Sequence, residues 1–289
     1  MKTLSHNHVR TNGLTLHTVQ AGPKGGPLLI LLHGFPEFWQ CWEQQIDFFA
    51  EKGFRVVVPD QRGYNTSSKP SSVSSYRAEP IARDVLGLVE SLGRRKAHIV
   101  GHDWGGFVAW YLGNRFPQWV EKLAVLNCPH PRVMRQHLLT NRAQQKKSWY
   151  IFYYQLPWLP EWSMSRNNWE FAKKGLQTTS VRGTFSDEEM AQYVEAWSQP
   201  GALTAMIRWY RAGLLMMKPQ RSESLAPRKI EVPTLLLWGV KDRFLSKEMA
   251  QPSIDFCSEG KLIFLKKATH WLQHEEPEKV NSLLLDFLS

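Results

Sequence analysis

The segment Gly101-His102-Asp103-Trp104-Gly105 constrains the fold of this chain more than any other. It follows the apolar run His98-Ile99-Val100 and has the form Gly-x-nucleophile-x-Gly, in which a buried strand turns sharply into a helix and lifts one side chain out of the sheet. Serine is the commonest residue at that position, but here it is aspartate. A carboxylate with a pKa of about 3.9 is already an anion at neutral pH. We therefore expect Asp103 to be a nucleophile that forms a covalent ester; the alternative is that it only caps the following helix.

Strands and helices alternate along most of the sequence. Short apolar runs predict buried strands at 28–32, 55–58, 97–100, 123–126, 234–238 and 262–265. Helical periodicity predicts helices at 39–51, 77–92, 105–116, 247–256 and 277–287. A turn at Asn12-Gly13 before the weakly alternating segment 14–19 predicts an early hairpin. This order indicates an α/β fold with a mostly parallel central sheet flanked by helices.

The alternation stops between Cys128 and about Pro227. This block has a helical pattern and is rich in aromatic residues, as in Trp149-Tyr150-Ile151-Phe152-Tyr153-Tyr154. We predict a core made of residues 1–128 and 228–289, with residues 129–227 inserted as a helical lid, or cap. Open α/β sheets bind ligands at the carboxyl ends of their strands, so we expect the cap to cover those ends.

Two further residues complete a possible catalytic triad with Asp103. Asp242 and His270 each lie beyond the carboxyl end of a predicted strand, and the order nucleophile, acid, histidine is that of α/β-hydrolases. In this interpretation His270 is the base, and Asp242 holds its imidazole tautomer and stabilises the protonated form. His274 and Asp255 are the nearby competitors, and Asp242 could instead be a turn former.

A third motif, His33-Gly34-Phe35-Pro36, follows the first buried strand. It could be only a tight turn, because glycine and proline are common in loops. In α/β-hydrolases the corresponding loop supplies one backbone N–H of an oxyanion hole, and the residue after the nucleophile supplies the other. We therefore expect Phe35 and Trp104 to be the two donors.

Taken together, the spaced motifs resemble those of the epoxide hydrolases of the α/β-hydrolase fold. The resemblance runs along the whole chain and rests on 33–36, on Asp60-Gln61-Arg62-Gly63-Tyr64, on 101–106, on Ser198-Gln199-Pro200-Gly201, on Asp242 and on Thr269-His270-Trp271-Leu272-Gln273-His274. It implies an enzyme that opens an epoxide through an aspartyl ester and hydrolyses that ester to a vicinal diol, without a metal or an organic cofactor.

The resemblance also implies two cap tyrosines that point at the nucleophile and hydrogen-bond the epoxide oxygen. The matching positions are Tyr150 and Tyr210, although Tyr153 and Tyr154 are close enough to Tyr150 to be alternatives. All of these tyrosines could instead be cap core. A phenol with a pKa of about 10 can protonate the alkoxide that forms when an epoxide opens. We further expect substrate contacts from His33, Pro36, Trp104 and Tyr154.

Other functions remain open at this point. A dehalogenase could use the same aspartate, but haloalkane dehalogenases usually carry asparagine where Phe35 stands, and fluoroacetate dehalogenases usually have arginines just after the nucleophile. A serine esterase is disfavoured, since no serine occupies a Gly-x-Ser-x-Gly elbow. A protein of this fold could also bind an apolar ligand without catalysis, or use the aromatic run to touch a membrane.

Composition narrows the class of protein. The 289 residues carry a formal net charge of +10, but the basic residues are scattered, which argues against nucleic acid as a partner. The three isolated cysteines, Cys41, Cys128 and Cys257, are typical of reduced packing residues. No apolar run is long enough for a membrane span or a signal peptide. We expect a cytoplasmic protein, a monomer or homodimer, that acts on a small apolar epoxide.

Overall fold

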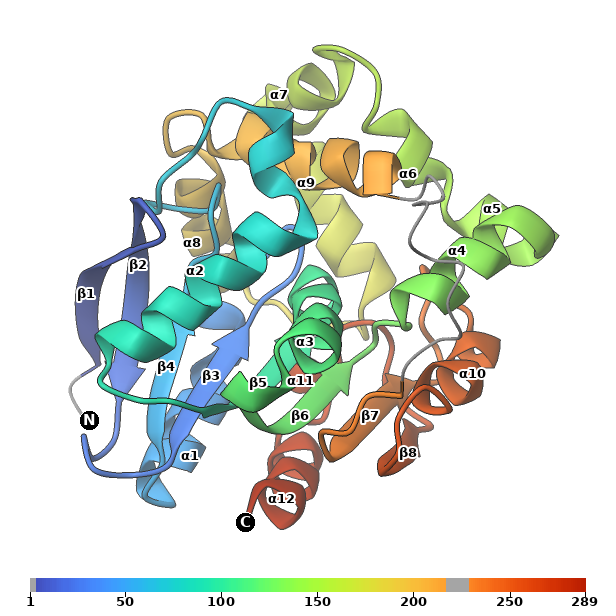
Figure 1. Ribbon diagram of the computed structural model, residues 1–289. Helices are drawn as coiled ribbons and strands as arrows, with labels where there is room; N and C mark the ends of the chain where they lie inside the picture. Colours follow the sequence, from blue (N-terminus) through green and yellow to red (C-terminus); the bar gives the residue numbers. More distant parts are fainter. Residues whose placement is uncertain (1–3, 217–228) are drawn as a thin grey trace.

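The computed structural model describes residues 4–216 and 229–289, and these residues form one sheet with helices around it (Figure 1). The strand order in the described residues is β1-β2-β4-β3-β5-β6-β7-β8. Strands β1 and β2 form an antiparallel hairpin, and β2 also pairs antiparallel with β4. All the remaining neighbouring pairs are parallel. The strands are β1 Ser5–Thr11, β2 Leu14–Ala21, β3 Leu28–Leu32, β4 Arg55–Pro59, β5 Ala97–His102, β6 Val120–Leu126, β7 Thr234–Gly239 and β8 Gly260–Leu265.

The inner parallel strands carry continuous apolar runs because both faces of the sheet are covered there. Along β3, Leu28, Ile30 and Leu32 belong to one buried cluster, whereas Leu29 and Leu31 belong to another on the opposite face. Helices α2 Ala78–Ser91, α3 Trp104–Arg115 and α10 Ala250–Ile254 contribute to the first cluster. Helices α1 Glu43–Glu51, α11 Leu272–Glu275 and α12 Pro277–Leu288 contribute to the second.

The expected fold class is confirmed, and the predicted strands and helices are found within a few residues of their predicted ends. Short 3-10 turns add Trp39–Trp42, Val73–Tyr76, Pro117–Trp119 and Lys247–Met249. The early hairpin predicted at Asn12-Gly13 is confirmed by the antiparallel pairing of β1 with β2, although no range was predicted for β1. This strand lies at the edge of the sheet with mostly exposed or half-exposed side chains, so its polar sequence has no apolar alternation to reveal it.

Cys41, Cys128 and Cys257 are buried free thiols, as predicted.

Six helices stand between β6 and β7 in the described residues and lie over the carboxyl ends of β3, β5 and β6 (Figure 1). Buried hydrogen bonds connect them to the loops that follow β3 and β4. Trp197 Nε1 donates to the carbonyl of Pro36 at 2.5 Å, and Trp209 Nε1 donates to that of Arg62 at 3.0 Å. The helices are α4 Pro131–Thr140, α5 Arg142–Lys147, α6 Trp149–Tyr153, α7 Leu159–Thr179, α8 Asp187–Trp197 and α9 Ala202–Met216.

The predicted boundary between residues 227 and 228 lies outside the described residues. Helix α7 contains a kink, because residues 166–169 leave helical geometry. Among the described residues, none of the helices is both long and apolar enough to span a bilayer.

Candidate active site

Asp103 occupies the sharp turn between β5 and α3 that the sequence predicts. Its φ of 50° and ψ of −118° lie in a region that non-glycine residues rarely adopt, which is typical of strained functional turns. Close packing holds the turn: a Cβ at Gly105 would lie 2.1 Å from the carbonyl oxygen of Leu32, and one at Gly34 would lie 2.4 Å from Cβ of Asp103. The carboxylate of Asp103 makes no capping hydrogen bond to α3, so the capping interpretation is wrong.

The carboxylate of Asp103 faces donors on two sides. The backbone N–H of Phe35 donates to Oδ1 at 2.9 Å, and Nε2 of His270 lies 3.6 Å from Oδ2. Trp104 is the first residue of α3, so its N–H has no partner within the helix. Burial alone would raise the pKa of Asp103, but His270 and the Phe35 N–H lower it by more, which keeps this buried carboxylate ionised.

His270 connects Asp103 to Asp242. Its Nδ1 donates to Oδ2 of Asp242 at 2.7 Å, and the ring is buried. Oδ1 of Asp242 accepts the backbone N–H groups of Phe244 and Leu245 at 2.7 and 2.8 Å. Burial lowers the pKa of His270, but the charges and hydrogen bonds of Asp242 and Asp103 outweigh it and raise the pKa to about 10. The two carboxylates therefore hold an imidazolium between them at neutral pH.

The competing residues lie elsewhere. His274 donates through Nε2 to Oε1 of Glu37 at 2.7 Å, and Asp255 accepts from Gln251 at an exposed position directly after α10. Of the two histidines, only His270 contacts both carboxylates, and Asp242 is the acid that it contacts. The geometry thus brings Asp103, His270 and Asp242 into one line.

Asn127 is a residue at the site that the sequence did not single out. Its Nδ2 donates to Oδ2 of Asp242 at 2.8 Å and to the carbonyl of Thr269 at 2.9 Å, while its Oδ1 accepts the N–H of Gly239 at 2.6 Å. It follows the last residue of β6 directly and has a φ of 41°. A polar residue at the carboxyl end of a buried strand is the signal that could have found it, because Asp103 shares that position.

A buried polar network lies beneath His270 and was also missed. Both ring nitrogens of His102 face acceptors: Nδ1 lies 3.0 Å from Oε2 of Glu37, and Nε2 lies 2.9 Å from the carbonyl of His270. Gln273 and Tyr193 also donate to the Glu37 carboxylate. Burial alone would raise the pKa of Glu37, but its hydrogen bonds to His102 and His274 hold it far below its usual value. Through His102, the Glu37 carboxylate therefore holds in place the loop that carries His270.

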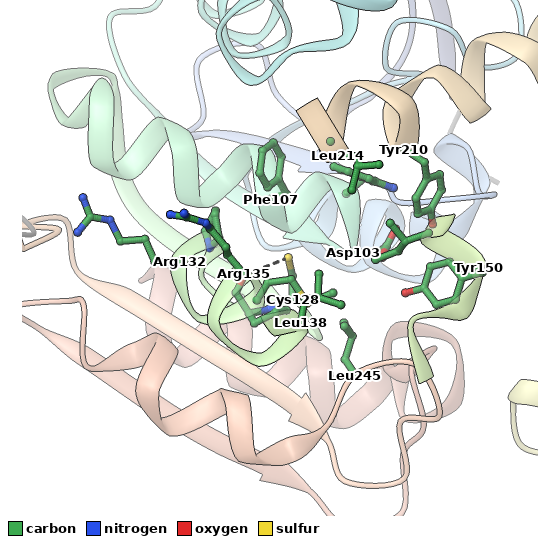
Figure 2. A pocket seen from close by; sticks show the side chains of 16 residues that line it. Asp103, Phe107, Cys128, Arg132, Arg135, Leu138, Tyr150, Tyr210, Leu214 and Leu245 are labelled. Carbon is green, nitrogen blue, oxygen red and sulfur yellow. Dashed lines mark hydrogen bonds between the residues drawn. The ribbon is translucent and has the colours of Figure 1, made fainter. Parts of the chain in front are cut away.

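Two tyrosines from the helices between β6 and β7 lie at the open side of Asp103 (Figure 2). Tyr150 comes from α6 and Tyr210 from α9, and their ring centroids are 5.8 Å apart. Neither phenol oxygen has a hydrogen-bond partner in the part of the chain that is described. Burial raises the pKa of both phenols well above its usual value, and the negative charge of Asp103 adds to the effect, so both keep their protons. The hydroxyl of Tyr153 instead bonds Ser163, away from the site.

Two cavities meet at Asp103, Tyr150 and Tyr210. The first, about 180 Å³, runs past Trp104 and Leu138 towards Arg132 and Arg135, which lie at the far end in Figure 2. The second, about 630 Å³, is the larger. Its lining includes Pro36, Tyr154, Phe171, His270 and Trp271. Both linings are mainly apolar, as expected for a site that binds an apolar molecule.

Three of the four predicted substrate contacts line these cavities, namely Pro36, Trp104 and Tyr154. His33 does not. Its ring is fully buried, with Nδ1 2.9 Å from the carbonyl oxygen of Gly34 and Nε2 accepting the N–H of Gln61 at 3.0 Å. With both ring nitrogens engaged by backbone groups, His33 shapes the loop that carries Phe35 and does not contact a ligand in either cavity. The prediction for His33 was therefore wrong.

Within residues 4–216 and 229–289, no group of three or more histidine, cysteine, aspartate or glutamate side chains is arranged to hold a metal ion.

Comparison with known proteins places this geometry in context. The family model described as "alpha/beta hydrolase fold" matches residues 27–277. The chain is 45% identical to AB hydrolase superfamily protein YfhM of Bacillus subtilis (strain 168), over 97% of this chain and 96% of that protein. It is 37% identical to Epoxide hydrolase 4 of Homo sapiens, over 97% of this chain and 77% of that protein. A crystal structure of Bacillus megaterium epoxide hydrolase with an inhibitor superposes with a TM-score of 0.87 at 30% identity, covering 98% of this chain and 99% of that one.

Proposed function

Because this chain belongs to the epoxide hydrolases of the α/β-hydrolase fold, we propose that it hydrolyses an epoxide to a vicinal diol through an ester of Asp103. One observation carries the proposal. Two protonated phenols without hydrogen-bond partners, Tyr150 and Tyr210, border the same cavities as a carboxylate that is paired with His270. A nucleophile and proton donors thus stand around one apolar space. We also propose that residues 129–227 form the cap and that the rest of the chain is the core.

In the first step, Oδ2 of Asp103 attacks an epoxide carbon. Oδ1 is held by the N–H of Phe35 at 2.9 Å, whereas Oδ2 has only the longer contact of 3.6 Å with Nε2 of His270, so Oδ2 is the oxygen better able to attack. A carbon–oxygen bond to Asp103 forms, the epoxide C–O bond breaks, and the alkoxide takes a proton from Tyr150 or Tyr210. A halide would leave as a stable anion and would need no such donor, so the two phenols favour an epoxide over a carbon–halogen bond.

In the second step, His270 takes a proton from a water molecule that attacks the ester carbonyl of Asp103. The oxyanion forms on Oδ1, where the N–H groups of Phe35 and Trp104 stabilise it. The bond between the carbonyl carbon and the alkyl oxygen then breaks, and that oxygen takes the proton from His270. The proton of the new Asp103 carboxyl group returns to the tyrosine, and the diol leaves. His270 then takes back from solvent the proton that it had released in the ester, which restores the starting charges.

The first step prepares the second. Esterification removes the negative charge of Asp103, which is one of the groups that raise the pKa of His270. The pKa of His270 therefore falls in the ester, and the imidazole becomes available as a base. This change in charge explains how His270, which is cationic in the free protein, can accept a proton in the second step.

The decisive experiment is to trap the ester. We expect His270→Gln, incubated with styrene oxide, to gain the mass of one epoxide, with the added mass on the peptide that contains Asp103. The matched control Asp103→Asn should gain no mass. An inactive His270→Gln protein without the adduct, or one that still forms diol without it, would overturn the ester mechanism.

A further inference from the structure

The outer surface of the cap carries an unusual set of exposed apolar side chains. Six of the ten large apolar side chains that are exposed in the described residues come from the short stretch 149–171. We call these six residues the aromatic patch: Trp149, Phe152, Leu156, Trp158, Trp162 and Phe171. Trp158 is the most exposed, at 70%. Contiguous exposed apolar surface in a folded protein marks a site of interaction.

Contacts between α6 and the start of α7 place Trp149 and Trp162 on neighbouring segments. The rings of Trp149 and Tyr153 are 5.7 Å apart, and the hydroxyl of Tyr153 bonds Ser163, the neighbour of Trp162. The guanidinium of Arg166 lies 4.4 Å from the ring centre of Trp162. Figure 1 shows α6 and the first part of α7 on the side of the molecule away from the sheet, whereas the end of α7 reaches Trp271 through Thr179. The patch is therefore an outer face of the cap.

The charge around the patch is positive. Residues 142–174 contain six basic side chains and two acidic ones. Both acidic side chains are neutralised, since Glu161 pairs with Arg211 at 2.9 Å and Glu170 pairs with Lys174 at 2.8 Å. Arg142 and Lys146 have no carboxylate partner in the described part of the chain. A second copy of this protein would bring the same positive charge to the interface, whereas an anionic surface complements it.

The patch also borders the entrance to the site. Trp149 and Phe171 are exposed and at the same time line the larger cavity, together with Lys146. A molecule that enters this cavity from outside therefore passes the apolar and basic surface of the patch.

We propose that the aromatic patch docks this protein on the surface of a bilayer that contains anionic lipids, with the larger cavity opening towards the acyl chains. Tryptophan rings lie favourably at the level of lipid headgroups, and nearby lysines and arginines are attracted to anionic lipid. The docking itself does not depend on the proposed reaction. The consequence that apolar epoxides enter from the membrane does rest on the proposed function.

Vesicle sedimentation tests the docking. We expect the full chain to sediment with vesicles of phosphatidylcholine and phosphatidylserine, and to bind pure phosphatidylcholine vesicles more weakly. The triple variant Phe152→Ser/Trp158→Ser/Trp162→Ser should lose at least about tenfold in partitioning, because it removes buried apolar area at the interface. The control Phe264→Ser, which removes an exposed ring from the sheet edge at β8, should bind like the wild type.

The outcomes separate this proposal from the proposed function. Turnover of a small water-soluble epoxide by the triple variant should match the wild type, whereas turnover of an apolar epoxide dissolved in anionic vesicles should fall with binding. Failure of the wild type to bind vesicles, equal binding by the triple variant, or a dimer in gel filtration that the triple variant abolishes would overturn membrane docking. The binding and gel-filtration results do not depend on whether Asp103 forms an ester, whereas the turnover results require the proposed function.

Discussion

At the scale of single residues, Asn127 contributes most to the site among the residues that the sequence did not reveal. It donates one hydrogen bond to Asp242 and one to the loop that carries His270, and it accepts one from the end of β7. Its side chain therefore ties together the acid and the base, and it stays out of both cavities. We regard it as a positioning residue.

The substitution Asn127→Asp tests this role. The new carboxylate cannot donate to Asp242 and places a like charge beside it, so we expect kcat to fall by about a hundredfold. The free energy of unfolding should fall by about 1–3 kcal/mol, the cost of an unsatisfied buried acceptor. Steady-state kinetics and urea denaturation measure the two effects.

Asn12→Asp is a matched control. Asn12 also has a positive φ, and its Nδ2 also donates to an aspartate, Asp84, at 2.9 Å and to the carbonyl of Pro80 at 3.1 Å. It lies outside both cavities, so its substitution should lower stability and leave kcat unchanged. Equal losses of kcat in the two variants would show that Asn127 acts only through stability.

His270 makes a prediction about pH. In the free protein its pKa is about 10, because the two carboxylates outweigh the effect of burial. The ester has lost the charge of Asp103, so the midpoint there must lie below about 10. We expect the rate of ester hydrolysis to rise with pH through that lower midpoint and to level off when His270 is neutral. Rapid-quench single-turnover measurements across pH follow this rate.

The same measurement with Asp242→Asn provides the comparison. Removing the second carboxylate lowers the pKa of His270 further, so the midpoint should move to lower pH. A hydrolysis rate that falls as the pH rises towards 9 would contradict the role of His270 as a base.

At the scale of elements, helix α6 carries tyrosines to two different environments. Tyr150 faces both cavities, whereas the hydroxyl of Tyr153 is already bonded to Ser163. We expect Tyr150→Phe to slow ester formation by about a hundredfold, the lower end of the effect of a general acid. Tyr153→Phe should change the rate of ester formation by less than about threefold. Stopped-flow tryptophan fluorescence would follow ester formation, and a reversed order of effects would assign the donor to Tyr153.

The elements differed in how readily the sequence revealed them. The parallel strands were easy to predict, because burial on both faces requires runs such as Leu28–Leu32. The predicted hairpin implied a strand before Asn12, but the extent of β1 was not predicted, because an exposed edge strand carries no such pattern. The kink at residues 166–169 was missed as well, since its polar residues Arg166, Asn167 and Asn168 are compatible with a continuous helix.

At the scale of the whole molecule, the sheet region and the helices between β6 and β7 together enclose two cavities that meet at Asp103. An epoxide with a large group on each ring carbon would fill both. We expect Leu138→Trp, which fills the smaller cavity, to raise KM for such a substrate by about tenfold. KM for a small terminal epoxide should not change.

Leu139→Trp is the control for this prediction. Leu139 is the next residue of α4, is 67% exposed and does not line either cavity. It should leave KM for both substrates unchanged. If Leu138→Trp also leaves both unchanged, the smaller cavity does not hold substrate.

The sequence by itself determined the fold class, the turn at Asp103, and the order of Asp103, Asp242 and His270. These features depend on local patterns: apolar runs, glycines that permit close packing, and polar residues directly after strands. Only the tertiary structure decided that the ring of His33 bonds backbone groups and that the hydroxyl of Tyr153 bonds Ser163. It also decided that Asn127 and Glu37 support the site. Each of these outcomes depends on partners distant in sequence or on the direction in which a helix face turns, and single-chain patterns do not record either.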